Sequence, residues 1–192
     1  YLLWFWLQDD DYHPYQLLGH SIQKIAGAVT LGELDFLLLN KQTQEIEHWE
    51  VALKYYLGEN ELNLSEWFGL NRQDTLQRKL RHFTQRQFQF SETSQYTIQR
   101  KFAVMKGQLY LPEHHYASSI PEWINTSRRL GQWGTTIPVL HYYRLQRHEW
   151  ICPDQHPSSQ TAKWWSNGLY HNVDTEPMYY MFRQPVLLFI PA

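Results

Sequence analysis

Two apolar runs between Leu31 and Lys54 carry more ionisable residues than an ordinary buried hairpin tolerates. The first run places Glu33 and Asp35 two residues apart, and the second places Glu50 four residues before Lys54. Side chains of a strand alternate between its two faces, so each of these pairs shares a face if the runs are strands. An antiparallel hairpin would then gather carboxylates and an ammonium group on one surface. Grouped carboxylates are costly to bury unless a cation neutralises them, so this stretch indicates a chemical site.

The length of 192 residues suffices for one well-buried domain, which we divide into a core over residues 1–111 and a β-rich extension over residues 112–192. Cys152 is the only cysteine, which excludes internal disulfides and multi-cysteine zinc sites and favours a cytoplasmic protein. The apolar start, residues 1–7, follows no basic region and precedes no cleavage site, so we predict the end of a core helix there. Because the chain begins with Tyr1 instead of Met, we expect a fragment. No apolar run is long enough to span a membrane.

The charge is unevenly distributed along the chain. The formal net charge is −2, but residues 71–106 contain eight basic and two acidic residues, a net +6 that leaves −8 for the remainder. A basic segment beside an acidic one would suit an anionic substrate held near a metal site. The alternative interpretation is a helix whose charged face is simply solvated.

Hydrophobic periodicity predicts the first elements of the core. Residues 1–7 form a helix, and residues 17–26 and 29–39 form strands joined by a turn at Gly27. Residues 45–57 fit both an amphipathic helix and a strand, and their alternation of apolar and polar side chains favours the strand.

The clearest helix covers residues 71–88, where an apolar stripe from Leu76 to Phe83 also brings Lys79 to the inward face. The later elements are a hairpin of strands 97–105 and 108–111, a short helix at 122–130, and strands at 138–145, 149–152 and 185–191. This order predicts an α/β (α+β) fold, with an αβββαβ core around a mixed central sheet and a β-rich C-terminal extension.

The predicted order, with Gly32-Glu33-Leu34-Asp35-Phe36 on its second strand, resembles the PD-(D/E)XK nuclease-like, or restriction-endonuclease-like, superfamily. Nearly the whole chain resembles a bacterial family of unknown function, domain of unknown function family 1853. The motifs that carry this second resemblance are, in order, residues 30–38, residues 48–57, Asn71-Arg72-Gln73-Asp74 with Lys79-Leu80, residues 106–109, residues 147–150 and residues 184–186.

The superfamily resemblance implies a nuclease that uses Mg²⁺ or Mn²⁺ to hydrolyse phosphodiester bonds of DNA or RNA. In such a site carboxylates hold the cation, which lowers the pKa of bound water, and a nearby lysine orients or deprotonates that water. By this resemblance Asp35 is the central metal ligand, Glu50 is the acid of the third strand and a further metal ligand, and Lys54 is the catalytic lysine. The further candidates are Glu33 as a metal ligand, and Lys79 and Arg72 as contacts for the nucleic acid.

One position departs from the superfamily pattern. The acid of that pattern stands two residues before the lysine, where this chain has Ala52, and Glu50 lies about 7 Å further along the strand. Either the acid has migrated, or the site is degenerate and the domain binds nucleic acid or a protein partner without cleavage. A third interpretation is purely structural: Asp35 caps a sheet end, and Glu50 pairs with Lys54 to fix the strand register. The oligomeric state is left open by the sequence.

Overall fold

The computed structural model describes residues 2–9, 11–114, 120–138, 141–152, 167–172, 174 and 179–185. The chain divides into two compact units, which we call the first unit (Tyr1–Lys54 and Gln77–Lys106) and the second unit (Tyr55–Leu76 and Gly107–Ala192). The predicted domains, 1–111 and 112–192, are each continuous along the chain, whereas each compact unit contains two separate segments.

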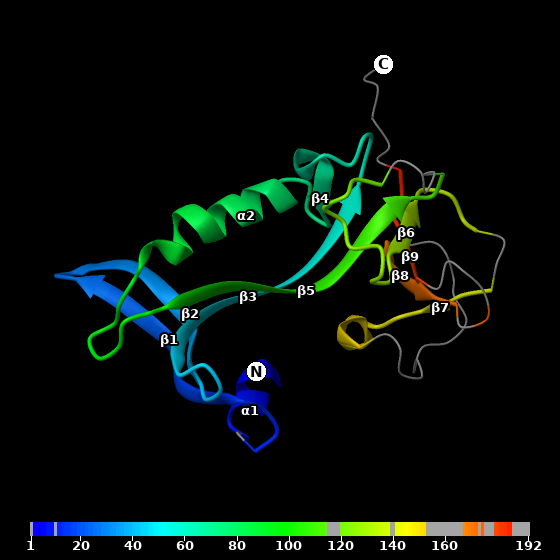
Figure 1. Ribbon diagram of the computed structural model, residues 1–192. Helices are drawn as coiled ribbons and strands as arrows, with labels where there is room; N and C mark the ends of the chain where they lie inside the picture. The colour runs from blue at the N-terminus through cyan, green and yellow to red at the C-terminus, as the bar shows by residue number, and fades with distance from the viewer. Residues whose placement is uncertain are drawn as a thin grey trace. The chain divides into compact units, whose positions relative to one another are not determined.

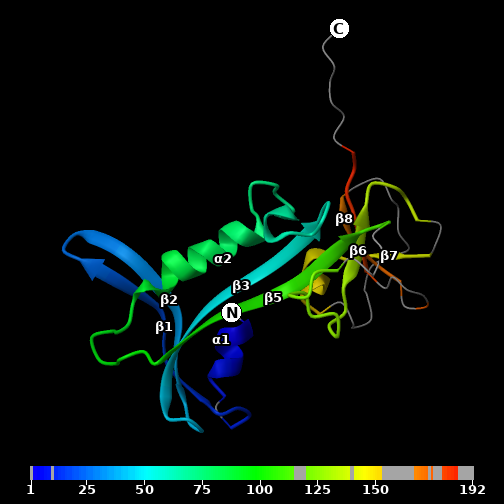
Figure 2. The same ribbon diagram turned by 45° about the horizontal axis from the view of Figure 1, so that its top comes forward.

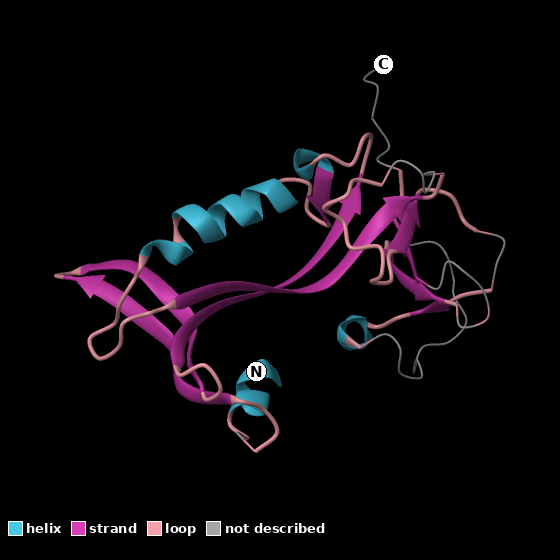
Figure 3. Ribbon diagram, in the orientation of Figure 1, coloured by secondary structure: helices cyan, strands magenta, loops and turns pink. Residues whose placement is uncertain are grey.

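The first unit begins with one helix and three strands and continues with a second helix and a further strand (Figures 1 and 3). Its elements are α1 (Leu2–Leu7), β1 (Tyr15–Ala26), β2 (Val29–Asn40), β3 (Glu45–Gly58), α2 (Leu76–Gln85), the 3₁₀ turn η2 (Gln87–Gln89) and β5 (Arg100–Pro112). The last residues of β3 and β5 and the first residue of α2 belong to the second unit. The 3₁₀ turn η1 (Leu64–Glu66) and the short strand β4 (Trp67–Gly69) are inserted before α2, and the sequence patterns did not predict them.

The strands form a mixed sheet. β1 pairs with β2, and β2 with β3, both antiparallel, and β5 is the next neighbour of β3. In Figures 1 and 2, β3 and β5 run in the same direction, an arrangement that needs a crossover connection such as the one containing α2. Residues 45–58 are a strand rather than a helix because a strand lies on each side of them, and this pairing overrides their helix-compatible pattern.

The core of the first unit lies on the strands and on the segment that follows α2. Leu34, Leu37 and Ile98 are its buried centre, and Phe90 packs against them. On α2, Phe83 is buried, and so is Leu76, which belongs to the second unit, as the predicted apolar stripe requires. The helices lie on opposite sides of the strands in Figures 1 and 2, with α2 over the strands and α1 beneath them. None of the helices in the described part of the chain is long and apolar enough to cross a membrane.

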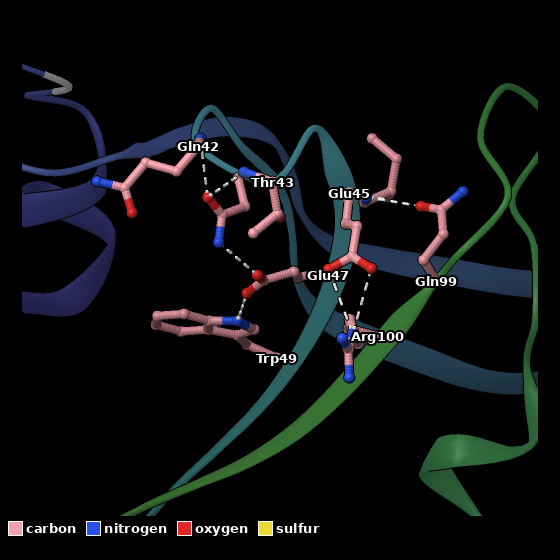
Figure 4. Close-up of polar contacts among 9 residues, drawn as sticks. Gln42, Thr43, Glu45, Glu47, Trp49, Gln99 and Arg100 are labelled. Atoms are coloured by element: carbon pink, nitrogen blue, oxygen red, sulfur yellow. Dashed lines mark hydrogen bonds and ion pairs between the residues drawn. The ribbon is translucent and has the colours of Figure 1, made fainter.

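The side chain of Asn40 organises the turn between β2 and β3 by bonding to Gln42, Thr43 and Glu47, which are labelled in Figure 4. Its Oδ1 accepts the backbone N–H groups of Gln42 at 3.0 Å and Thr43 at 3.3 Å, and its Nδ2 donates to Glu47 Oε1 at 2.8 Å. Trp49 Nε1 donates to the other oxygen of Glu47 at 2.7 Å. The buried carboxylate of Glu47 therefore has both oxygens paired within the hairpin, which stabilises the charge.

The second unit contains the remaining strands and a second core. Its strands are β6 (Gly131–Gly134), β7 (Tyr143–Arg144), β8 (Gly168–His171) and β9 (Tyr179–Phe182), with the 3₁₀ turn η4 at Arg147–Ile151. β6 is parallel to β5 and to β9, and β8 is antiparallel to both β9 and β7. One of its buried clusters consists of Leu57, Tyr110, Leu145, Trp150, Leu169, Tyr179 and Met181.

Two predictions about the centre of the chain were wrong in their boundaries. The helix predicted over residues 71–88 begins at Leu76, because Asn71 and Asp74 form a turn in which Asp74 N–H donates to Asn71 O at 2.9 Å. The predicted hairpin around Gly107 is instead one continuous strand, β5, with β3 and β6 as its hydrogen-bonded neighbours. Gly107 adopts a φ of 129° that only glycine takes easily.

The later predictions were less accurate. Residues 122–130 form turns instead of a helix, because Asn125 Oδ1 accepts the N–H of Ser127 and competes with a helical bond. Residues 149–152 are not a strand: a capping box between Gln146 and Glu149 starts η4 instead. Within residues 138–145 only Tyr143–Arg144 is a described strand, and residues 139–140 lie outside the described residues, as do residues 186–191 of the last predicted strand.

Candidate functional site

β2 and β3 stop pairing at Asp35. The last regular pair of their ladder joins Phe36 and Trp49. Beyond this pair, backbone N–H groups of the two strands donate to side-chain carboxylates of the opposite strand instead of to its backbone carbonyls. Asp35 Oδ2 accepts the N–H of Val51 at 2.8 Å, and Asp35 N–H points to Glu50 Oε1 at 3.4 Å. This exchange brings the two carboxylates together at the point where the strands separate.

Glu50 is fully buried, with an exposed fraction of 0 %. Its Oε1 lies 2.6 Å from His48 Nε2, and its Oε2 accepts a hydrogen bond from Gln87 Nε2. Gln87 is held in place by its neighbour Phe88, whose ring stacks on Phe83 and meets the ring of His48 edge-on. Both oxygens of this buried carboxylate are thus paired with protein donors.

Asp35 is half-buried and surrounded by charges of both signs. Burial is the main cause that raises the pKa of Asp35, and the negative charges of Glu50 and Glu33 raise it further. The N–H of Val51 and the ammonium group of Lys79 lower the pKa, but they do not compensate fully. The pKa of Asp35 therefore lies above its ordinary value.

Asp35 lines a pocket of about 480 Å³ in the first unit. The lining residues are Leu31, Gly32, Glu33 and Asp35 from β2, and His82, Arg86, Gln87, Gln89 and Phe90 from the end of α2 and the segment after it. The pocket thus has an acidic wall, Glu33 and Asp35, and a basic wall, His82 and Arg86. Among the described residues no ion pair joins Arg86 to either carboxylate, so the guanidinium and the two carboxylates present opposite charges to a ligand.

Gln87 connects the pocket to the buried carboxylate. Its Nε2 donates to Glu50, and its Oε1 lies 3.0 Å from His82 Nδ1. A continuous chain of hydrogen bonds therefore runs from exposed His82 through Gln87 and Glu50 to buried His48. His48 Nδ1 has no hydrogen-bond partner in the described part of the chain.

The structure brings four of the predicted site residues together. Asp35 lies beside Glu50, Glu33 and Lys79, each of which acts on its pKa. Lys79 is half-buried on α2, as its place on the apolar stripe predicted, and its Nζ lies 4.0 Å from the centre of the Phe83 ring.

The other two predicted residues lie elsewhere. Lys54 is half-buried on β3, and its Cα lies about 13 Å from that of Glu50, because four residues of strand separate them. Arg72 belongs to the second unit, where it donates to Glu59 and its guanidinium lies 4.2 Å from the centre of the Phe68 ring. These contacts explain Arg72 as a surface ion pair.

Asp35 and Glu33 are the carboxylates of the pocket that could hold a cation. Within the described ranges, no group of three or more His, Cys, Asp or Glu side chains is arranged to hold a metal ion. Mg²⁺, however, is often held by one or two carboxylates and keeps several water ligands. Asp35 and Glu33 both face the pocket and supply such a pair, whereas Glu50 is already occupied by His48 and Gln87.

Sequence reasoning missed the basic wall and the hydrogen-bonded chain behind it. His82, Arg86 and Gln87 follow the apolar stripe of α2 without any motif that marks them. The only signal was their position in the basic segment at residues 71–106. Their role depends on the contact between η2 and β3, in which Gln87 donates to Glu50. No local sequence pattern predicts this contact.

Comparison with known proteins gives a family but no function. A search of curated proteins and a search of solved structures each gave no match. A family model described as "Domain of unknown function (DUF1853)" matches residues 1–184, nearly the whole chain. The chain belongs to this family.

Proposed function

We propose that the first unit is a divalent-cation-dependent phosphodiesterase that acts on nucleic acid. The observation that carries this proposal is the pocket in which the acidic wall of Glu33 and Asp35 faces the basic wall of His82 and Arg86. A phosphate group with its counter-cation has charges that match both walls. Neither a free anion nor a free cation would match both.

The order of elements supports a restriction-endonuclease-like core. A helix, three antiparallel strands, a crossover with a helix and a fourth strand beside the third make up the first unit. This is the αβββαβ order that the resemblance to the PD-(D/E)XK superfamily implies. The pocket lies on β2, the strand on which that resemblance places the central acid.

Each residue of the pocket has a role in this proposal. Asp35 and Glu33 would hold Mg²⁺, which when bound lowers the pKa of a water ligand and neutralises charge on the phosphate. Glu50 holds Asp35 in place through the Asp35 N–H. Arg86 binds a phosphate oxygen with its guanidinium, which is suited to planar oxyanions.

The cationic partner of Asp35 in this proposal is Lys79 instead of Lys54. Lys79 acts directly on the pKa of Asp35. Lys54 lies four residues of strand beyond Glu50. Lys54→Ala and Lys79→Ala therefore distinguish the arrangement implied by the resemblance from the one that the pocket favours.

The test is cleavage of labelled single- and double-stranded DNA and RNA oligonucleotides with Mg²⁺ or Mn²⁺. Asp35→Asn should reduce cleavage about 100-fold or more, because ligation of the cation contributes several kcal/mol to the transition state. Asp11→Asn makes the same chemical change in an exposed turn before β1 and should cleave like the wild type. Equal rates for the wild type and Asp35→Asn would reject the proposal.

A second candidate is binding of nucleic acid without cleavage. The observation in its favour is that both oxygens of Glu50 are occupied by protein donors and that Ala52 stands at the position of the expected acid. In that case oligonucleotides should bind with an affinity that falls steeply with salt, while no cation supports cleavage. Calorimetry with Mn²⁺ on the wild type and Asp35→Asn separates the two functions, because only the first requires binding of the cation at Asp35.

A further inference from the structure

The amide of Gln87 has a single orientation that satisfies its neighbours. Gln87 donates its Nε2 amino group to Glu50 Oε2, because a carboxylate oxygen accepts a hydrogen bond that an amide oxygen cannot donate. The carbonyl oxygen of the same amide then faces His82 Nδ1 at 3.0 Å. Amide orientations follow from such networks, and here the buried charge of Glu50 fixes the direction.

This orientation determines which nitrogen of His82 carries a proton. An amide oxygen accepts hydrogen bonds and cannot donate, so His82 Nδ1 must be the protonated nitrogen. In the neutral ring Nε2 then carries a lone pair. His82 is exposed and lines the pocket with Arg86, Glu33 and Asp35, the charged groups that face it there. No other hydrogen bond to the His82 ring is made within the described residues.

We infer that His82 is the proton acceptor of the site, held by Gln87 in the tautomer that presents its Nε2 lone pair to the pocket. This inference rests on the proposed function. It assigns a role to the hydrogen-bonded chain behind the pocket. The carboxylate of Glu50 fixes the orientation of the Gln87 amide, and this amide fixes the tautomer of the His82 imidazole. Glu50 and Gln87 are positioning residues, and His82 is the residue that meets the reacting water.

The step is balanced with water as the only co-reactant. The oxygen of a pocket water forms a bond to phosphorus, and one of its protons passes to His82 Nε2. The bond between phosphorus and the leaving oxygen breaks, its electron pair stays on that oxygen, and the oxygen takes a proton from bulk water. The imidazolium returns its proton to solvent and regains the starting tautomer.

The first test is independent of cleavage. Long-range ¹H–¹⁵N spectra of the labelled full chain report the tautomer of His82, assigned by comparison with His82→Asn, at a pH where the same spectra show a neutral ring. The wild type should show the Nδ1–H tautomer. Gln87→Leu should shift His82 toward the Nε2–H tautomer, which free histidine prefers in water. An Nε2–H tautomer in the wild type would overturn the inference.

The second test uses cleavage. His82→Asn keeps an amide donor near the position of Nδ1 but lacks Nε2, and it should lose about 100-fold in rate, as expected for removal of a general base. His114→Asn replaces an exposed histidine of the second unit and should have no effect. Wild-type rates in a folded His82→Asn variant would overturn the inference, whereas a wild type that cleaves no substrate would reject the proposed function and leave the tautomer to be decided by NMR.

Discussion

Glu47 and Glu50 lie three residues apart on β3, and both are buried carboxylates that accept two side-chain hydrogen bonds. The donors to Glu47 are Asn40 and Trp49, its neighbours within the same hairpin (Figure 4). Those to Glu50 are His48 and the distant Gln87. The two carboxylates are therefore alike in burial and in the number of side-chain donors. They differ in the chemical type of these donors and in the other residues that the donors contact.

The donors around Glu47 cannot change roles. Indole nitrogen only donates, and the Asn40 amide is fixed because its oxygen accepts the N–H groups of Gln42 and Thr43. The donors around Glu50 are fixed only while Glu50 is a carboxylate, since an imidazole can move its proton and the Gln87 amide can rotate once that acceptor is replaced. The partners of Glu47 therefore support a turn, whereas Gln87 also contacts His82 and orients a side chain of the pocket. The comparison shows that a buried carboxylate is assigned a role by its partners and not by its burial.

Replacing each carboxylate by an amide should separate the two sites most strongly. Glu47→Gln puts an NH₂ group against a fixed donor and should lower the free energy of unfolding by about 2 kcal/mol. Glu50→Gln should cost less than about 1 kcal/mol, because rotation of Gln87 or a proton shift on His48 restores an acceptor. Urea unfolding of both variants measures the difference. Equal losses would show that the two environments are equally rigid.

The pocket beside Glu50 depends on a close contact that the turn beside Glu47 lacks. A Cβ at Gly32 would lie 2.8 Å from Phe90 Cε2, so Gly32→Ala must displace a ring that lines the pocket. We expect a loss of about 1–2 kcal/mol in unfolding free energy, together with weaker binding of Mn²⁺ in calorimetry. As a control, Ala28→Gly changes an exposed residue near the turn between β1 and β2 and should leave Mn²⁺ binding unchanged.

Two arginines offer a matched test of the basic wall. Arg86→Ala should weaken oligonucleotide binding roughly tenfold, the loss expected for one charge-assisted contact. Arg72→Ala removes an exposed pair with Glu59 and should change unfolding free energy by less than about 1 kcal/mol, with no change in binding. Fluorescence anisotropy at several salt concentrations measures both variants. Similar binding losses would mean that the pocket is not the binding surface.

The smallest expected effect is a pH dependence that belongs to Asp35 alone. Because folding raises the pKa of Asp35, the folded chain holds this proton more tightly than the unfolded chain. Stability should therefore fall as pH rises from the ordinary aspartate value of about 3.9 through the raised folded value, and then level off. Asp35→Asn should remove this fall, while Asp11→Asn should retain it. Urea midpoints across the acidic range test the sign.

Sequence patterns located the acidic wall but could not locate the basic one. Glu33 and Asp35 share a face of one strand, and strand alternation is a rule that a sequence reader can apply without the fold. Lys79 was also placed correctly, because its helical stripe has a strong period. Gln87 and His82 were missed, since their contacts cross from the end of α2 to β3 and have no periodic signature.

The sequence by itself determined the elements with strong periodicity: the first helix, the strand that carries Glu33 and Asp35, and the apolar stripe of α2. Helix propensity and side-chain alternation depend on residues that are close in the sequence, so a short stretch of sequence is enough to predict these elements. Only the tertiary structure decided that residues 45–58 are a strand, that β5 runs straight through Gly107, and that Glu50 is held by Gln87. These outcomes depend on which segments become neighbours, and long-range pairing energies outweigh the small local preferences that a pattern records.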